Sequence, residues 1–339
     1  MLQDPLTDEA TVRRVAASFE TTELRVVSVI PSGQRNDNFL VEDAGRRRYA
    51  LRRYRRNRDR DRIIFQAMFQ SFAHSQGLPV ARIVSTRLGA PLLDDSSGTW
   101  MLCAYVDGAD YRFDSMPQVA GAAATLADFH RLTRTFPHAE VVGRGNPNVR
   151  RWWTHGTILL EELDLLFVDR SVDAEIRFLH RWHAELVREW PLERLDSLPA
   201  AWVHGDFHGR NVTFSGDAVR GIFDFDLVHF GFAVEDVGDA LFRFGRARRG
   251  STRLRPGAAG AFLDGYKRSR TLTEEERSAI GIMASLAMAR DRSYYDLLAA
   301  DERDPVPFLK EKVHLMRTRR EQWHKHAGSI LASLTNRTA

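Results

Sequence analysis

A change of pattern near residue 107 divides this sequence of 339 residues into two parts. Before that point, short β-rich segments alternate with turn residues, which predicts antiparallel strands joined by tight turns. After it, long segments with apolar residues three and four apart predict helices. The sequence therefore predicts an α+β protein with two domains, residues 1–106 and 107–339, and the chain is long enough for both.

The first domain is predicted to contain a sheet and one long helix after an N-terminal helix that begins near Thr7. The long helix covers residues 61–76, where apolar residues recur at helical spacing, and Gly77 ends it. The predicted strands are residues 24–30, 38–42, 48–53, 80–87 and 100–106. Turn residues separate the strands and favour antiparallel pairing.

The second domain is predicted to be helical apart from one β-rich island, Ala201–Phe230. The predicted helices are residues 119–132, 152–169, 173–189, 259–268, 274–299 and 308–334. Within the island, residues 212–214 and 219–225 can pair as a hairpin around a turn at 215–217. Such a hairpin would place Asp224 at a strand end close to Asn211.

Composition excludes several classes of protein. The formal net charge is +4, with 49 basic and 45 acidic residues, which argues against a general nucleic-acid binder. Cys103 is the single cysteine, so no internal disulfide can form, and its apolar neighbours favour a small buried side chain over a nucleophile. The sequence shows neither a signal peptide nor an apolar stretch of membrane-spanning length. We therefore expect a cytoplasmic protein that binds neither nucleic acid nor membrane.

Basic residues are concentrated between positions 46 and 62, where ten of seventeen residues are Arg. One interpretation is a solvated strand edge followed by a helix start, because Arg is usually exposed. The other is a rim that attracts phosphate groups to a nucleotide site. The sequence leaves both open.

The chemistry-bearing residues lie in the β-rich island. Asp206 follows an apolar strand and a Gly, where the backbone can turn sharply, and Asn211 comes five residues later. Asp and Asn supply hard oxygen ligands, which suit Mg²⁺ bound mainly through phosphates. A further Asp can accept the proton of a substrate hydroxyl. Because phosphoryl transfer requires alignment, metal and a positioned carboxylate, the island predicts this reaction.

The spacing from Asp206 to Asn211 is that of a protein-kinase catalytic loop, and Asp224 follows at the distance of the kinase metal ligand. The segments HGDFHGRNV (204–212), IFDFD (222–226) and DVGD (236–239) resemble the aminoglycoside phosphotransferase/choline kinase family. This resemblance implies a bilobal protein-kinase-like fold, with an antiparallel β lobe carrying a helix and a larger, mainly helical lobe. The helical lobe would hold the catalytic loop at 203–226 and the acceptor site.

The resemblance also implies roles for particular residues. Asp206 is similar to the catalytic Asp, and Asn211 and Asp224 to the ligands of Mg²⁺. The phosphoryl donor would be ATP or GTP, and the sequence does not choose between them because the base-binding contacts are to main chain.

Four further residues of the motif have implied supporting roles. Asp236 resembles the buried Asp that braces the catalytic loop, and His204 is expected to hydrogen-bond within the loop because buried polar side chains need partners. Asp226 either supports the metal site or caps a turn. His208 either supports the loop or faces the substrate.

On the nucleotide side, Ser32 and Gly33 resemble the family's first hairpin, which covers the phosphates, although a plain β-turn explains them equally well. Arg52 occupies the strand where relatives place a phosphate-binding Lys, and Arg can hold phosphate at two points. Gln66 stands where a helix usually supplies a Glu to orient that cation. Solvated roles for Arg52 and Gln66 remain open. Cys103 and Tyr105 lie in the segment that resembles the hinge beside the nucleobase.

The acceptor pocket is less constrained by the sequence. Residues 108–339 have nearly balanced charge, which does not favour a polycationic aminoglycoside. A neutral or anionic antibiotic, a nucleoside-like compound and a small metabolic alcohol remain open. The polar and aromatic candidates for acceptor contacts are Trp152, Trp153, His155, Glu235, Asp239, Tyr294, Tyr295 and Asp296.

The leading hypothesis is a small-molecule O-phosphotransferase, with antibiotic resistance as one role. A stress-response-type Ser/Thr protein kinase and a catalytically silent nucleotide-binding regulator are the alternatives. We expect a monomer or a homodimer.

Overall fold

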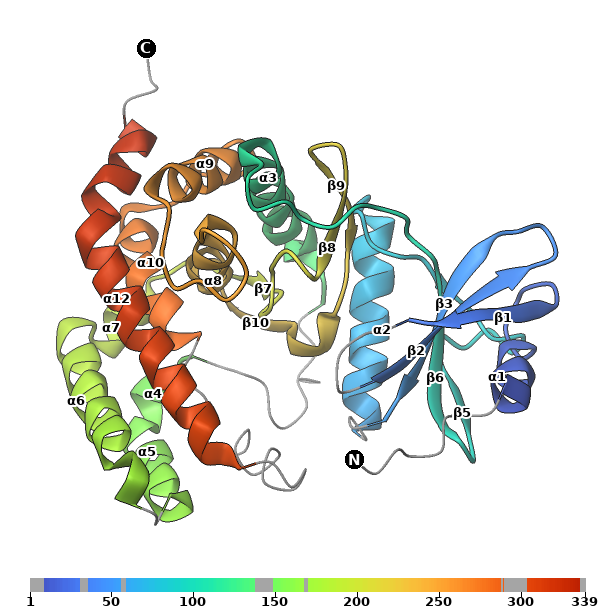
Figure 1. Ribbon diagram of the computed structural model, residues 1–339, viewed down its shortest axis with the longest axis horizontal. Helices are drawn as coiled ribbons and strands as arrows, with labels where there is room; N and C mark the ends of the chain where they lie inside the picture. Colours follow the sequence, from blue (N-terminus) through green and yellow to red (C-terminus); the bar gives the residue numbers. More distant parts are fainter. Residues whose placement is uncertain are drawn as a thin grey trace. The chain divides into compact units, whose positions relative to one another are not determined.

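The computed structural model describes residues 9–30, 36–55, 59–137, 149–167, 170–287, 289 and 304–335. The chain divides into two compact units (Figure 1). Unit 1 comprises residues 1–109, 135–144 and 220–226, and unit 2 comprises residues 110–134, 145–219 and 227–339. Asp224 therefore belongs to unit 1, together with the N-terminal part of the chain, and each unit is described by itself.

Unit 1 is built on an antiparallel sheet which, in the described part of the chain, has the strand order β1-β2-β3-β6-β4, with β5 paired to β6. The strands are β1 (Leu24–Val29), β2 (Asn36–Asp43), β3 (Arg48–Tyr54), β4 (Ile83–Val84), β5 (Leu93–Asp95) and β6 (Gly98–Ala104). The antiparallel sheet is confirmed. The strand predicted at 80–87 is wrong in length, because the backbone turns after β4: Thr86 N donates to Ala90 O at 2.7 Å. The short strand β5 was not predicted.

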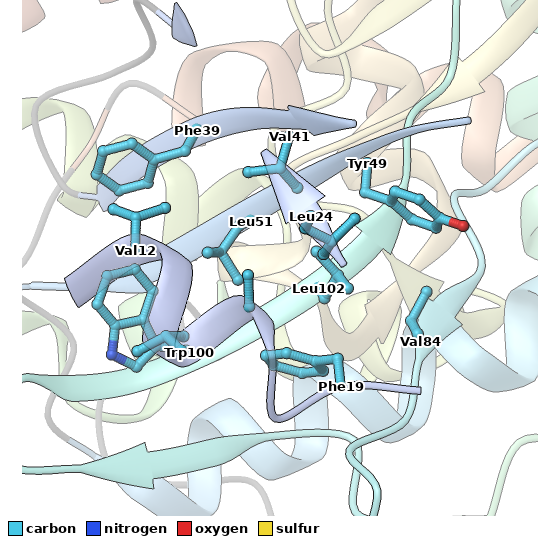
Figure 2. Packing of buried hydrophobic residues seen from close by; sticks show 12 residues of the cluster. Val12, Phe19, Leu24, Phe39, Val41, Tyr49, Leu51, Val84, Trp100 and Leu102 are labelled. Carbon is cyan, nitrogen blue, oxygen red and sulfur yellow. The ribbon is translucent and has the colours of Figure 1, made fainter. Parts of the chain in front are cut away.

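One face of this sheet packs against α1 (Glu9–Ala16). Figure 2 shows this cluster, in which Leu51 of β3 lies near Val12 and Trp100, whereas Tyr49 of the same strand lies at the other end, toward Val84. Successive strand residues face opposite sides, so Arg52 lies on the other face. That face packs against α2 (Arg60–Ser75) (Figure 1).

Helix α2 has defined ends and positions the segment that follows β9 (Ala218–Ile222). Its N-cap residue is Asp59, whose side chain accepts a hydrogen bond from Arg62 N at 3.1 Å. Phe225 lies against Phe69 of α2, with ring centroids 6.1 Å apart. Ile222 N also donates to Pro79 O at 2.7 Å. These contacts fix residues 222–225 in unit 1.

Unit 2 is mainly helical. Its helices are α3 (Met116–Leu132), α4 (Arg151–Thr154), α5 (Gly156–Leu166), α6 (Asp173–Glu189), α7 (Leu192–Asp196), α8 (Ala233–Gly245), α9 (Pro256–Lys267), α10 (Glu274–Leu286) and α12 (Pro305–Thr335). The helix predicted at 152–169 is instead divided at His155. At this point Trp152 O, which a continuous helix would pair with Gly156 N, lies 2.6 Å from His183 Nε2, and a Cβ at Gly156 would lie 1.9 Å from the same atom. The helix predicted at 274–299 ends at Leu286, and residues 290–299 lie outside the described residues.

Helix α8 was not predicted, and it is buried among α3, α9, α10 and β7 (Ala200–Val203) (Figure 1). Gly238 lies in its interior, where Gly has low helix propensity. A Cβ there would come within 2.7 Å of Ala284 N in α10, so the packing requires Gly.

Two small sheets complete the β-rich island. β7 pairs antiparallel with β10 (His229–Phe232), and the predicted hairpin forms from β8 (Val212–Ser215) and β9. Within the described ranges, no helix combines the length and apolar character that a membrane crossing requires.

Candidate active site

The loop between β7 and β8 begins on a buried carboxylate. Asp236 of α8 is 2% exposed and accepts hydrogen bonds from His204 N at 2.7 Å and Gly205 N at 2.9 Å. His130 Nε2 lies 3.1 Å from the same carboxylate. Gly205 has φ +77°, and a Cβ there would lie 2.6 Å from Leu227 O. Asp236 thus braces the start of the loop, as the motif predicted.

Within the loop, Asn211 lies beside Asp206. The Asn211 side-chain nitrogen donates to Asp206 O at 2.9 Å and to Asp206 Oδ2 at 3.2 Å. His204, which is fully buried, accepts a hydrogen bond from Asp206 N at 3.3 Å. The compact loop is confirmed, and the amide oxygen of Asn211 makes no hydrogen bond to the residues that the structure describes.

Two basic side chains flank the Asp206 carboxylate. His208 Nε2 lies 3.4 Å from Asp206 Oδ2, and Arg243 Nη2 of α8 lies 3.4 Å from Oδ1. Burial raises the pKa of Asp206, but His208 and Arg243 outweigh it, so the pKa lies below its ordinary value. Asp206 is therefore ionised at neutral pH and can accept a proton.

In unit 1, a second set of polar contacts centres on Asp226, whose side chain and backbone oxygen have different partners. Arg52 Nη1 lies 3.6 Å from Asp226 Oδ1, and its Nε donates to Asn38 Oδ1 at 3.2 Å. Two side chains of α2 donate to Asp226 O, Arg62 at 2.9 Å and Gln66 at 3.4 Å. The carboxylate that accompanies Arg52 is therefore Asp226, while Gln66 holds the backbone of that residue.

The electrostatics of these cations follow from the same contacts. Burial lowers the pKa of Arg52, but Tyr54, Asp226 and Asp224 together raise it above its ordinary value. Burial lowers the pKa of Arg62 to about 10, against the opposing effect of Asp226. Both guanidinium groups remain charged at neutral pH.

Asp224 combines an unusual backbone conformation with a buried side-chain oxygen. Its φ is +65°, a region that residues other than Gly enter rarely and at a cost of about 1–3 kcal/mol. Its Oδ1 is buried and makes no hydrogen bond to any residue that the structure describes. A buried carboxylate oxygen without a partner is costly, and a bound cation would satisfy it. The buried oxygen of Asp224 therefore fits a bound cation.

Cys103 and Tyr105, which were predicted to lie beside the nucleobase, make contacts within the protein. The Cys103 side chain packs in the core between the sheet and α2, where burial raises its pKa to about 11. Gln70 Nε2 donates to its sulfur at 3.4 Å. Tyr105 lies under the guanidinium of Arg48, 4.9 Å from ring centroid to Cζ, and Tyr105 N donates to Arg48 O at 2.9 Å. The predicted contacts at Ser32 and Gly33 fall outside the described residues.

Several residues that were predicted to contact the acceptor instead make hydrogen bonds or packing contacts within the protein. Trp152 is 5% exposed and Trp153 Nε1 donates to Trp190 O at 2.6 Å. Glu235 accepts a hydrogen bond from Phe232 N at 2.7 Å, at the start of α8. His155 is exposed and contacts Thr154. Asp239 lies in the network around Arg243, and the candidates at residues 294–296 lie outside the described part of the chain.

Sequence reasoning missed Arg62 and Arg243, although a signal for each was present. Arg62, Gln66 and Gln70 are four residues apart on α2, and all three are buried. A polar row on the buried face of an apolar helix indicates a specific set of partners. Arg243 follows Asp239 by four residues, a spacing that brings two side chains together on a helix.

The arginines of the segment 46–62 fall into two groups by their partners. Arg47, Arg48 and Arg60 pair with nearby carboxylates at the surface. Arg52 and Arg62 instead point to Asp226. Arg52 and Arg62 have the burial and contacts expected of a built site.

The family model described as the phosphotransferase enzyme family matches residues 26–276. Among curated relatives, a homoserine kinase of Rhodopseudomonas palustris (strain BisA53) is 26% identical over 274 residues, which is 80% of this chain and 79% of that protein.

Solved structures show the same fold. An aminoglycoside phosphotransferase from Alicyclobacillus acidocaldarius has a TM-score of 0.64 at 21% identity, covering 98% of each chain. An amicoumacin kinase in complex with AMP-PNP and Ca²⁺ has a TM-score of 0.64 at 15% identity, covering 93% of this chain and 94% of that one. The predicted α+β, kinase-like fold is confirmed.

Proposed function

Because the chain belongs to the phosphotransferase enzyme family, we propose that it moves the γ-phosphoryl group of ATP or GTP to a hydroxyl group of a small molecule. Asp206 is the base, and Asn211 and Asp224 are the metal ligands. The observation that carries the proposal is the ionised Asp206 beside Asn211, in a short loop fixed by buried Asp236.

In the proposed reaction, the acceptor oxygen forms a bond to the γ-phosphorus. The bond from that phosphorus to the bridging oxygen breaks, and the nucleoside diphosphate leaves with the electron pair. Asp206 accepts the hydroxyl proton, which is supported by its low pKa and by its 27% exposed side chain. His208 and Arg243 hold the carboxylate in place.

The chain's own residues also support nucleotide binding. Arg52 is 22% exposed and charged, and Asp226 and Asn38 orient it, so it is suited to hold phosphate oxygens. The Oδ1 of Asp224 and the amide oxygen of Asn211, which lack a hydrogen-bond partner among the described residues, are hard ligands. Mg²⁺ bound by them would neutralise phosphate charge.

The acceptor class is the open part of the proposal. The relatives named above are a homoserine kinase and antibiotic kinases, so an amino-acid alcohol and an antibiotic are both candidates. Antibiotic resistance is one outcome of the test below rather than its premise.

The test is nucleotide consumption by the full chain with Mg²⁺ and ATP or GTP, with and without acceptors. The panel contains L-homoserine, choline, an aminoglycoside and amicoumacin. We expect acceptor-dependent formation of nucleoside diphosphate and a phosphorylated small product. Phosphorylation of protein without a small product would replace the proposal by the protein kinase, and nucleotide binding without any transfer would replace it by the silent regulator.

Replacing Asp224 with Asn should raise the Mg²⁺ concentration needed for half-maximal activity by at least about 10-fold, the lower range for loss of a group that supports a metal site. Asn retains the shape of the side chain but removes its charge. Initial rates measured against free Mg²⁺ at saturating nucleotide check this. Asp217→Asn removes an exposed carboxylate from the nearby hairpin and should leave the Mg²⁺ dependence unchanged; equal curves for wild type and Asp224→Asn would contradict the assignment.

A further inference from the structure

A cavity of about 420 Å³ lies at one end of the sheet of unit 1, where the turn between β2 and β3 meets the end of β6. Its volume falls in the range of sites for small molecules. Its walls come from three segments of the chain, and it is lined by residues 46–49, Arg82, Ala104, Tyr105 and Asp107. All of these residues belong to unit 1, so the cavity is formed within one compact unit.

The cavity is separate from the polar contacts around Arg52. Tyr49 pairs with Ala104 across β3 and β6 and belongs to the cluster that packs against α1. Figure 2 shows Tyr49 at the end of that cluster, with its hydroxyl group pointing away from the other side chains. Arg52 lies three residues further along β3 and therefore on the opposite face of the sheet. The cavity is thus a different site from the one described around Arg52.

Backbone hydrogen bonds and one stacked pair of side chains hold the walls of the cavity together. Ala104 N donates to Arg82 O at 2.8 Å, and Tyr105 N donates to Arg48 O at 2.9 Å. The Arg48 guanidinium also lies over the Tyr105 ring, with 4.9 Å from Cζ to the ring centroid. A site whose walls are already fixed binds a ligand with a smaller loss of entropy. The cavity is therefore preformed.

The lining of the cavity is strongly basic. Among the residues that the structure describes, it holds four guanidinium groups and one carboxylate, which leaves three positive charges unbalanced within the lining. Arg47 is held by Asp43 from outside the lining, at 2.7 Å, and Arg48 pairs with Asp107. A concave surface of one charge sign concentrates the electric field and attracts ligands of the opposite sign. The cavity therefore favours an anion.

The other two arginines of the lining, Arg46 and Arg82, make no ion pair and no side-chain hydrogen bond with the residues that the structure describes. Arg46 has φ +61°, a conformation that Gly or Asn adopts at lower cost, so the turn itself gives no reason for an Arg. Arg82 comes from a different segment, and its charge opposes the rise that burial causes in the pKa of Tyr49. Two arginines that are distant in sequence thus converge on the cavity without a carboxylate.

We propose that this cavity is a second ligand site, which binds a small molecule with at least two negative charges carried by phosphate or carboxylate groups. Arg46 and Arg82 donate to its oxygen atoms, because guanidinium groups match the geometry of both kinds of oxyanion. The two paired arginines add positive charge, and the ring of Tyr105 offers an apolar surface to the organic part of the ligand. The carboxylate of Asp107 and the size of the cavity distinguish the site from an extended basic face that binds nucleic acid.

Isothermal titration calorimetry of the full chain, without nucleotide or metal, tests the proposal with two probes. Inorganic pyrophosphate supplies two phosphate groups, and malonate supplies two carboxylates. Arg46→Gln and Arg82→Gln each remove one charge from the cavity. Arg25→Gln removes an exposed charge elsewhere in unit 1 as the matched control, and Arg52→Gln removes the charge on the opposite face of the sheet. The melting temperature of each variant without a probe shows whether it is folded.

We expect the wild type to bind at least one probe with a Kd below about 1 mM. Arg46→Gln and Arg82→Gln should each raise that Kd by at least about 10-fold, the lower range for loss of a charge-assisted hydrogen bond. Arg25→Gln and Arg52→Gln should retain it. A saturating probe should also raise the melting temperature of the wild type and of Arg52→Gln more than that of the two cavity variants.

Binding of pyrophosphate alone assigns the site to phosphate compounds, and binding of malonate alone assigns it to carboxylates. Three results would overturn the inference: no binding of either probe to the wild type, an equal loss in Arg25→Gln and the cavity variants, or a loss confined to Arg52→Gln. Because the titration contains no nucleotide and measures no transfer, each of these results leaves the proposed function standing.

Discussion

Replacing Asp206 with Asn is expected to lower kcat by about 10²–10⁴-fold, the usual contribution of a general base. The substitution keeps the shape of the side chain and can keep the contact with Asn211, but it removes the atom that accepts the proton. The Kd of Mg·ATP and the free energy of unfolding should change little, because Asp206 is at the surface of its loop and no buried backbone group depends on its carboxylate. Steady-state kinetics with the acceptor found in the panel measure kcat.

A matched control is available in the same island. Asp217→Asn removes an exposed carboxylate from the hairpin turn and should retain full activity. A loss of less than about 10-fold in Asp206→Asn, well below the range for a general base, would show that the proton leaves by another route. Because the pKa of Asp206 lies below its ordinary value, protonation of this group should not reduce kcat/KM between pH 7 and pH 5, whereas a raised pKa would do so.

The sequence was sufficient for the local features of this protein and insufficient for those that depend on distant contacts. The contact between Asp206 and Asn211 was predictable because only four residues separate them, and a loop that short keeps both side chains together. The sheet of unit 1 was predictable from turn residues between β-rich segments. Its faces also follow from the alternation of residues along β3.

Other features depend on packing that no local pattern encodes. The pairing of Arg52 with Asp226 joins residues 174 positions apart by numbering, and it explains why α2 can have Gln66 where a Glu was expected. The division of the helix at His155 depends on His183, which lies on the next helix. Arg243 could be placed beside Asp206 only once α8 was known to run behind the loop. In each case the sequence shows the residue type but does not show which distant residue it contacts.

Replacing Asp236 with Ala is expected to destabilise the protein by about 3–5 kcal/mol, the range found when one partner of a buried polar set is removed. The substitution leaves His204 N and Gly205 N buried without an acceptor, and it removes one of the two partners of His130, the other being Tyr266. Urea denaturation followed by circular dichroism measures the change. Asp236→Asn should fall between wild type and Asp236→Ala, because its single side-chain oxygen can accept only part of the set.

Comparing the Asp236 and Asp206 variants distinguishes a residue that holds the loop in place from a residue that takes part in the reaction. Asp236→Ala should lose both stability and kcat, because the start of the loop is no longer fixed, whereas Asp206→Asn should lose kcat alone. Asp217→Ala provides the surface reference, for which a change within about 0.5 kcal/mol is expected. If the free energy of unfolding of Asp236→Ala lies within about 1 kcal/mol of the wild-type value, ordered water must replace the carboxylate. Otherwise the two backbone N–H groups would remain without an acceptor. The loop would then depend on its own hydrogen bonds, chiefly those of Asn211, for the position of Asp206.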